Sequence, residues 1–315
     1  MPMRVAAVDI GTVTARLLVA DVDDGRVSEV VRRSVITHLG EGWTKTGSLS
    51  PEGMARVEKV VAEFVAEARG LGATRSTGVA TSATRDAENA AEFIERLDAL
   101  GLRPEVIPGD REAYLSFLGA TYGMTGDGLL VVDVGGGSTE LVLGRVRAEG
   151  GFGAEIETAR SIDVGSRRIT ELFLRSDPPT GREIDEAAGW AVDELRPYFT
   201  GLRERPHEMI SVAGTATSLA AIEQALDPYD PGRVHGYRIA GPALVDTLEQ
   251  LASLTLEERR RVAGLEPERA GVIVGGALIL QTVMALAGLS STLVSEQDIL
   301  YGMVLDLDAS AEARP

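Results

Sequence analysis

The chain has 315 residues, 44% of them hydrophobic and 25% charged, so it has the composition of an ordinary globular protein with one large or two medium-sized domains. It contains no cysteine, which excludes disulfides, zinc sites built on thiolates and phosphatases with a cysteine nucleophile. The formal net charge of −17 argues against broad, sequence-independent binding to nucleic acid, because such binding needs a basic face.

Two apolar segments could in principle be a secretory signal or a membrane-spanning helix. The first apolar run ends at Asp9, before it reaches the length of a secretory signal, so we expect a cytoplasmic protein. Residues 270–289 are nearly all apolar and approach the length that spans a bilayer. They contain a Gly275-Gly276 pair and have neither aromatic belts nor a basic flank. We therefore expect a buried helix there and no membrane partner.

A repeated pattern occurs near the amino terminus and again in the middle of the chain. Residues 5–19 and 129–143 each contain an apolar run that ends at an acidic residue, Asp9 or Asp133. In both copies a turn of small residues follows, and then a second apolar run at the same offset. Each copy is typical of a β-hairpin with a carboxylate at its mouth. The repeat predicts a duplicated chain.

The other predicted elements alternate in the same way in both halves, because a third strand and then helices and short strands follow each hairpin. In the first half we expect strands at residues 26–33, 76–80 and 105–107, and helices at 51–71, 84–100 and 111–122. In the second half we expect helices at residues 167–174, 182–200 and 215–225, and a strand at 209–212. The pattern predicts two mixed α/β domains of βββαβα type, joined at the Gly-rich residues 122–128, with a ligand cleft between them.

The predicted turn of the second hairpin is the most informative stretch for chemistry. Gly135, Gly136 and Gly137 allow backbone N–H groups to approach an anion that any Cβ would hold away. Asp133 and Glu140 bracket these glycines with hard oxygen ligands of the kind that bind Mg²⁺ or Mn²⁺. The turn therefore indicates a phosphate cradle beside a metal site. The alternative is a tight hairpin turn with solvated carboxylates.

Two further turns lead from a strand into a helix, where free N–H groups and the helix dipole favour anions. Residues 79–85 place Arg85 in the first helical turn, and Asn89 lies one turn further on the same face. Residues 211–217 repeat this geometry in the second half. Taken singly, each turn is also typical of an ordinary N-cap.

Glu112 is expected in the first turn of a helix. A carboxylate in that position can serve as the base that activates a water molecule. The alternative, for this residue taken alone, is an acidic side chain that complements the helix dipole. The chain has no Walker A loop, because neither of its two lysines, Lys45 and Lys59, precedes a Ser in a Gly-rich turn.

Taken together, these segments resemble the exopolyphosphatase/guanosine pentaphosphate phosphohydrolase (Ppx/GppA) family, in its short two-domain type. The matching stretches follow the family's order over nearly the whole chain. They are Asp9-Ile10-Gly11 with Arg16-Leu17-Leu18, Leu39-Gly40-Glu41-Gly42, Ala80-Thr81-Ser82-Ala83 with Arg85 and Asn89, Glu112-Ala113, Asp133 to Leu141, Gly214-Thr215-Ala216-Thr217, and Gly276-Ala277-Leu278-Ile279-Leu280.

The resemblance implies an actin-like, ribonuclease-H-like α/β fold, duplicated in two domains with mixed sheets. The N-terminal domain would cover residues 1–124 and the C-terminal domain residues 125–294, and a last helix at residues 295–308 would pack back on the first domain. The implied activity is hydrolysis of phosphoanhydride bonds, which releases terminal orthophosphate from inorganic polyphosphate. Guanosine polyphosphate is the alternative ligand, and a homodimer is also expected.

The resemblance also implies a role for each site residue. Glu112 would be the catalytic base, and Asp133, Glu140 and Asp9 would bind Mg²⁺ or Mn²⁺. The residues that would hold phosphate are Gly135, Gly136, Gly137, Ser138, Arg85, Asn89, Gly214, Thr215, Thr12 and Arg16.

The chain departs from the family pattern at three points. Val13 stands where the family commonly has an Asn that contacts phosphate, and Arg111 precedes Glu112 where a second Glu is common. The helical C-terminal extension of the long members is missing, so we expect a preference for short polyphosphates. A preference for long chains would need a basic groove, for example around Arg167 and Arg168. Two other functions stay open: an actin-like ATPase or sugar kinase, and a guanosine polyphosphate sensor without catalysis.

Overall fold

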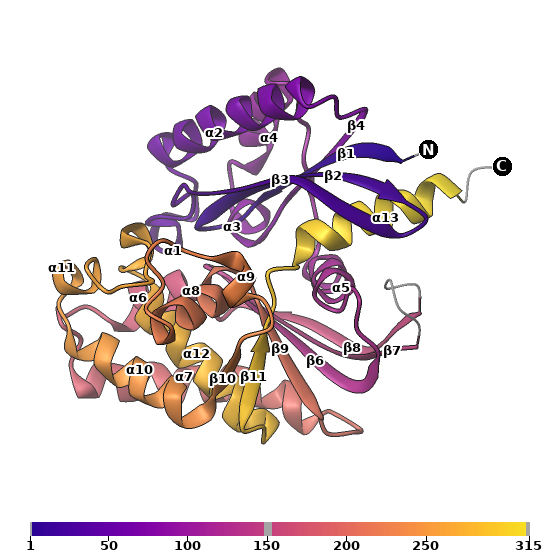
Figure 1. Ribbon diagram of the computed structural model, residues 1–315. Coiled ribbons are helices and arrows are strands. Elements are labelled where there is room, and N and C mark those ends of the chain that lie inside the picture. The colour runs from indigo at the N-terminus through magenta and orange to yellow at the C-terminus, as the bar shows by residue number, and fades with distance from the viewer. Residues whose placement is uncertain (1, 148–152, 313–315) are drawn as a thin grey trace. The chain divides into compact units, whose positions relative to one another are not determined.

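The computed structural model describes residues 2–147 and 153–312. The chain divides into two compact units, drawn together in Figure 1. The first comprises Met1–Thr125, Val146–Ala154 and Gln297–Pro315. The second comprises Gly126–Arg145 and Glu155–Glu296.

The first unit is built on a five-stranded sheet with the strand order β3-β2-β1-β4-β5. The first three strands form an antiparallel meander, whereas β4 is parallel to β1 and β5 is parallel to β4. The strands are β1 (Met3–Ile10), β2 (Thr14–Asp23), β3 (Arg26–Ile36), β4 (Arg75–Ala80) and β5 (Glu105–Val106). The helices are α1 (Trp43–Thr46), α2 (Pro51–Gly70), α3 (Ser82–Asp86), α4 (Ala90–Ala99), α5 (Gly109–Ala120) and α13 (Ile299–Glu312).

Alternating side chains of β1 serve two different cores, because successive residues of a strand point to opposite faces. Ala6 and Val8 join a core cluster that α2 and α4 complete. Val5 and Ala7 join a second cluster that includes residues of α5 and α13. This double burial explains why β1 reads as a continuous apolar run in the sequence.

The second unit is built on a six-stranded sheet with the strand order β10-β11-β9-β6-β7-β8. Its strands are β6 (Gly126–Val134), β7 (Thr139–Val146), β8 (Ala154–Ile162), β9 (Glu208–Val212), β10 (Arg238–Ala240) and β11 (Ser291–Val294). Its helices are α6 (Ser166–Phe173), α7 (Gly181–Thr200), α8 (Ala213–Glu223), α9 (Pro231–Val234), α10 (Gly241–Ser253), α11 (Leu256–Arg259), the 3-10 helix η1 (Pro267–Arg269) and α12 (Ile273–Ala287). The first unit's order returns here, with β8-β7-β6-β9-β11 in place of β3-β2-β1-β4-β5. This repetition confirms the duplicated α/β fold with mixed sheets that the repeat predicts.

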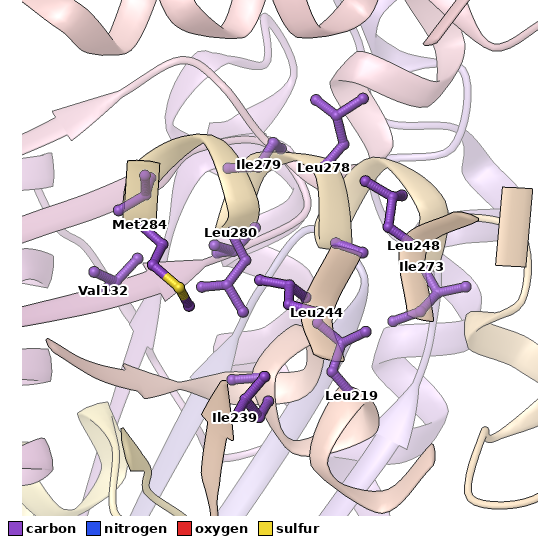
Figure 2. Packing of buried hydrophobic residues seen from close by; sticks show 14 of the residues in the cluster. Val132, Leu219, Ile239, Leu244, Leu248, Ile273, Leu278, Ile279, Leu280 and Met284 are labelled. Atoms are coloured by element: carbon purple, nitrogen blue, oxygen red, sulfur yellow. The ribbon is translucent and has the colours of Figure 1, made fainter. Parts of the chain in front are cut away.

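The apolar segment at residues 270–289 forms α12 in the core of the second unit. Figure 2 shows Met284 of this helix beside Val132 of β6, and Leu280 beside Leu244 of α10. Within the part of the chain that the structure describes, no helix is long and apolar enough to span a membrane.

Two differences from the sequence prediction concern helices. The single helix expected at residues 84–100 is divided into α3 and α4. At the break, the Asn89 carboxamide accepts a hydrogen bond from Leu49 N at 2.9 Å and donates one to Leu49 O at 2.9 Å, which holds the chain out of helical geometry. In addition, the sequence pattern predicts no element for residues 226–269, where the structure has α9, β10, α10, α11 and η1.

The helix α13 is fixed to the first unit by close packing. It packs against α5 and against β2, as Figure 1 shows. A Cβ added at Gly119 of α5 would overlap with Asp298 O, and one added at Gly302 of α13 would overlap with Leu115 O. The two helices therefore cross with their backbones in contact.

A buried ion network adds to this packing at the start of α13. Arg16 Nη1 donates to Asp298 Oδ2 at 2.5 Å, and Arg32 Nη2 lies 2.9 Å from the same oxygen. Burial raises the pKa of Asp298, but the charges of Arg32 and Arg16 outweigh burial and bring its pKa below the ordinary value of 3.8. A carboxyl group with a lowered pKa stabilises the fold above its ordinary value, and this contribution is lost as the pH falls through the lowered pKa.

We therefore predict that Asp298→Asn lowers the free energy of unfolding at pH 7 by about 3 kcal/mol, because it leaves two partly buried guanidinium groups without this counter-charge. The difference from the wild type should shrink as the pH is lowered from 7 to 3, measured by urea unfolding. The control is Asp98→Asn, which breaks an exposed ion pair with Arg103 and should cost at most about 1 kcal/mol. An equal loss of stability in both variants would contradict a stabilising role of the Asp298 carboxylate.

Candidate active site

In the second unit, residues 135–138 form the turn between β6 and β7. Gly135 N donates to Ser138 O at 3.0 Å and closes the turn. Gly136, Gly137 and Ser138 are buried, and in the described part of the chain their backbone N–H groups have no hydrogen-bond partner. Buried N–H groups almost always find a partner. Three consecutive amides of this kind can donate hydrogen bonds to the oxygens of an anion, and we call residues 135–138 the phosphate cradle.

Two carboxylates bracket the phosphate cradle. Asp133 is 7% exposed and Glu140 is 2% exposed. Glu140 Oε1 accepts hydrogen bonds from Ser138 Oγ at 2.8 Å and from Ser161 Oγ at 2.7 Å. These hydroxyl groups fix the Glu140 carboxylate in place.

The first unit has the same hairpin with a different charge pattern. Gly11 N donates to Thr14 O at 3.0 Å, the bond that closes the cradle in the second unit, and Asp9 lies opposite Arg16 in the register of β1 and β2. At the same offset in the second unit, the equivalent residues are Asp133 and Glu140. Opposed carboxylates repel each other unless a cation or a proton compensates them.

The carboxylates of the second hairpin therefore fit a divalent metal. Among the described residues, no three acidic or histidine side chains gather. Asp133 and Glu140 would hold such a metal, because carboxylate and phosphate oxygens are the ligands that Mg²⁺ prefers. The donor set, two hard carboxylates next to free amides, matches that arrangement.

Asp9 and Arg16 contact each other in the first unit. Arg16 donates to Asp9 Oδ2 from Nε at 2.9 Å and from Nη2 at 2.6 Å, and its Nη1 bonds Asp298. These bonds direct the Arg16 guanidinium toward carboxylates. Burial raises the pKa of Asp9, and the charge of Arg16 offsets only part of this effect. Asp9 Oδ1 is buried without a hydrogen-bond partner among the described residues, as expected for an oxygen that binds a ligand.

The structure brings Arg85 and Glu112 together. Glu112 is in the first turn of α5 and is 8% exposed. Its Oε2 accepts a hydrogen bond from Arg85 Nη1 at 3.0 Å, and the same nitrogen also donates to Ile107 O at 3.3 Å. Asn89 instead pairs with the backbone of Leu49, so its carboxamide points into a loop contact.

Other expected phosphate ligands lie at turns. Thr12 is 3% exposed, and its carbonyl oxygen accepts from Gly40 N at 2.9 Å. At the start of α8, Thr215 Oγ1 donates to Val134 O at 3.0 Å, which ties this helix to the strand that ends at the cradle. The Thr215 hydroxyl group therefore uses its hydrogen in the bond that positions α8.

Arg269 was not among the residues predicted from the sequence. A Cβ added at Gly214 would overlap with the Arg269 guanidinium, so the first turn of α8 has a cation directly over it. Ala213, the first residue of α8, has a φ of 61°, a strained conformation for a residue with a Cβ. Nothing local in the sequence signals this contact, because Arg269 comes from η1, far along the chain.

The chain is similar to known proteins over nearly its whole length. A model of the Ppx/GppA phosphatase family matches residues 18–308. The chain is 38% identical to Exopolyphosphatase 2 of Mycobacterium tuberculosis, over 96% of this chain and 98% of that protein. The crystal structure of an exopolyphosphatase-like protein, 35% identical, superposes with a TM-score of 0.92 over 99% of both chains. The Aquifex aeolicus member of the Ppx/GppA family, 31% identical, gives 0.82 over 100% of both.

These likenesses, together with the repeated strand order, confirm the actin-like duplicated fold. The family model covers most of the chain, and the two solved structures match it from end to end. The chain therefore belongs to the Ppx/GppA phosphatase family.

Proposed function

We propose that this protein is an exopolyphosphatase, which hydrolyses the terminal phosphoanhydride bond of inorganic polyphosphate and releases orthophosphate. The observation that carries the proposal is the phosphate cradle, whose three free amides lie between the carboxylates Asp133 and Glu140. The name of the Mycobacterium tuberculosis relative supports it. A homodimer, a cytoplasmic location and guanosine polyphosphate as alternative ligand stay predictions from the sequence.

In the proposed mechanism Glu112 is the general base. It takes a proton from a water molecule, whose oxygen forms a bond to the terminal phosphorus while the bond from phosphorus to the bridging oxygen breaks. The next phosphate of the chain leaves with the electron pair of that bond. Arg85 holds one oxygen of the Glu112 carboxylate and so fixes its orientation.

The amides of Gly136, Gly137 and Ser138 would hold the oxygens of the transferred phosphoryl group. Backbone donors that are already in place stabilise developing charge without reorganisation. A divalent metal, Mg²⁺ or Mn²⁺, held by Asp133 and Glu140, would neutralise charge on the phosphate oxygens. The Arg269 guanidinium lies over Gly214, and its Nε donates to Glu266 Oε2 at 2.7 Å.

Phosphate release from tripolyphosphate, compared with ATP turnover and with binding of guanosine polyphosphates, tests the proposed function. An exopolyphosphatase should release orthophosphate from tripolyphosphate. Turnover of ATP alone would favour an ATPase, and tight guanosine polyphosphate binding without hydrolysis would favour a sensor.

We predict that Glu112→Gln lowers kcat on tripolyphosphate by about 100-fold or more and leaves KM nearly unchanged, because the amide keeps the shape of the side chain but cannot accept the proton. The matched control is Asp110→Asn, an exposed acidic residue in the same first turn of α5, which should retain wild-type kcat. A Glu112→Gln enzyme with normal kcat would remove this residue from the role of base.

We also propose a preference for short chains, because the net charge of −17 repels the part of a polyphosphate that lies outside the site. The two arginines that were candidates for a basic groove are engaged within the second unit. Arg167 has a side chain only 10% exposed and lies 3.6 Å from Glu171, and Arg168 Nε donates to Gly137 O. They offer little free charge to an extended polymer.

Catalytic efficiency per chain end should therefore peak at oligophosphates, and added salt should improve the turnover of long chains relative to short ones, since it screens the repulsion within about 8–10 Å. Rates measured against chain length at two ionic strengths check this prediction. Efficiency that rises steadily with length and collapses in salt would instead show a basic groove.

A further inference from the structure

Backbone N–H groups at the start of α6 donate hydrogen bonds to the carbonyl oxygens of the phosphate cradle. Ser166 N donates to Gly135 O at 2.8 Å. Arg167 N and Arg168 N donate to Gly136 O at 2.9 and 3.1 Å. In many helices the first N–H groups are open to solvent or to a ligand. In α6 they donate to carbonyl oxygens of the cradle instead.

The third carbonyl group is held by a side chain. Arg168 Nε donates to Gly137 O at 2.9 Å, and its Nη2 lies 3.5 Å from Asp163 Oδ1. All three glycine carbonyl groups of the cradle therefore have donors from one short segment of chain.

Gly165 lets this segment come close. A Cβ added at Gly165 would overlap with Gly136 O and with the carbonyl carbon of Gly137. The residue has extended backbone, with a φ of −132°, so a side chain is excluded by the contact alone and not by backbone conformation.

The consequence follows from the planarity of the peptide bond. In a trans peptide, the C=O of one residue and the N–H of the next point in opposite directions. The carbonyl groups that α6 holds belong to Gly135, Gly136 and Gly137, and the opposite N–H groups are those of Gly136, Gly137 and Ser138. These are the three amides that have no partner in the described chain.

We infer that Gly165 and Arg168 are positioning residues for the terminal phosphoryl group, acting through the cradle and without contact to the substrate. They fix three peptide planes so that their N–H groups are presented together to the phosphate oxygens. This inference rests on the proposed function for the identity of the anion. In this role Arg168 needs its Nε–H, which donates to the cradle. A role as a positive charge in contact with the substrate would need the whole guanidinium instead.

The first unit repeats the arrangement, which supports a positioning role. Gly40 follows the third strand of its unit, as Gly165 does, and Gly40 N donates to Thr12 O at 2.9 Å. A Cβ added at Gly40 would overlap with the Thr12 side chain. The Leu39-Gly40 segment of the sequence thus holds its hairpin turn from the carbonyl side as well.

Side-chain length provides a sharp test at Arg168. In Gln the Nε2 donor stands as many bonds from Cα as the Nε of Arg, whereas Met has the same length without a donor. We expect Arg168→Met to weaken the binding of inorganic phosphate, and to raise KM for tripolyphosphate, by about 10-fold or more, the effect of misplacing one hydrogen bond to a charged group. Arg168→Gln should retain most of the wild-type affinity.

Gly165→Ala tests the same contact from the backbone, and should weaken phosphate binding by about 10- to 100-fold. The matched controls are Gly189→Ala in α7, where a Cβ has nothing within 4 Å, and Arg182→Met, whose side chain is 86% exposed. Both controls should bind phosphate as the wild type does. Thermal unfolding of each variant shows whether the fold is kept, and the Arg168 pair decides the question if Gly165→Ala does not fold.

The outcomes separate the inference from the proposed function. Equal losses in Arg168→Gln and Arg168→Met would overturn the inference, because the charge and not the Nε donor would then matter. Wild-type affinity in Arg168→Met, or no phosphate binding by the wild type, would overturn it too. A wild type that binds phosphate with the expected Met and Gln difference, but does not hydrolyse polyphosphate, would leave the inference standing and remove the exopolyphosphatase assignment.

Discussion

The direction of a few peptide planes at the mouth of a hairpin is the constraint on which the rest of this structure depends. An anion site made of amides exists only if the carbonyl groups of the same peptides are satisfied elsewhere. In the second unit, the segment that follows the third strand meets this need, and α12 supports that segment. A Cβ added at Gly275 would lie 2.7 Å from Ser166 O, so this glycine of the apolar helix allows α6 to pack closely against α12.

Duplication gives the chain two such hairpin turns, each preceded by an acidic residue. The residue at the equivalent position on the next strand determines which charged group that acidic residue can bind. Opposite Asp9 stands Arg16, which bonds Asp9 and, through Asp298, ties α13 into the first unit. At the equivalent positions the second unit has two carboxylates, Asp133 and Glu140, where the first unit has an aspartate and an arginine. One backbone geometry therefore carries a structural ion pair in the first unit and a metal-binding pair in the proposed site of the second.

The sequence predicts features whose cause is local, and it misses those whose cause lies in tertiary contacts. The hairpins, the Gly cradle and α12 follow from apolar runs and glycines that stand next to one another. The helix α10 could also be predicted from the sequence, because its buried Leu244, Leu248 and Leu251 have helical spacing. The helices α9 and α11 are too short to show a hydrophobic periodicity. The Arg269 contact with Gly214 and the loop contact of Asn89 depend on distant segments that come together only in the fold.

With a net charge of −17, the chain as a whole repels polyanions, so the proposed cradle would bind phosphate through neutral donors at short range. A basic surface would attract every polyanion over a distance of several ångströms, whereas amides act only at hydrogen-bond distance and only when correctly aimed. A site of this kind gains its affinity from alignment. It follows that uncharged residues such as Gly165, which touch no substrate, should matter more for phosphate binding than most of the chain's exposed arginines, many of which are paired with acids on the surface.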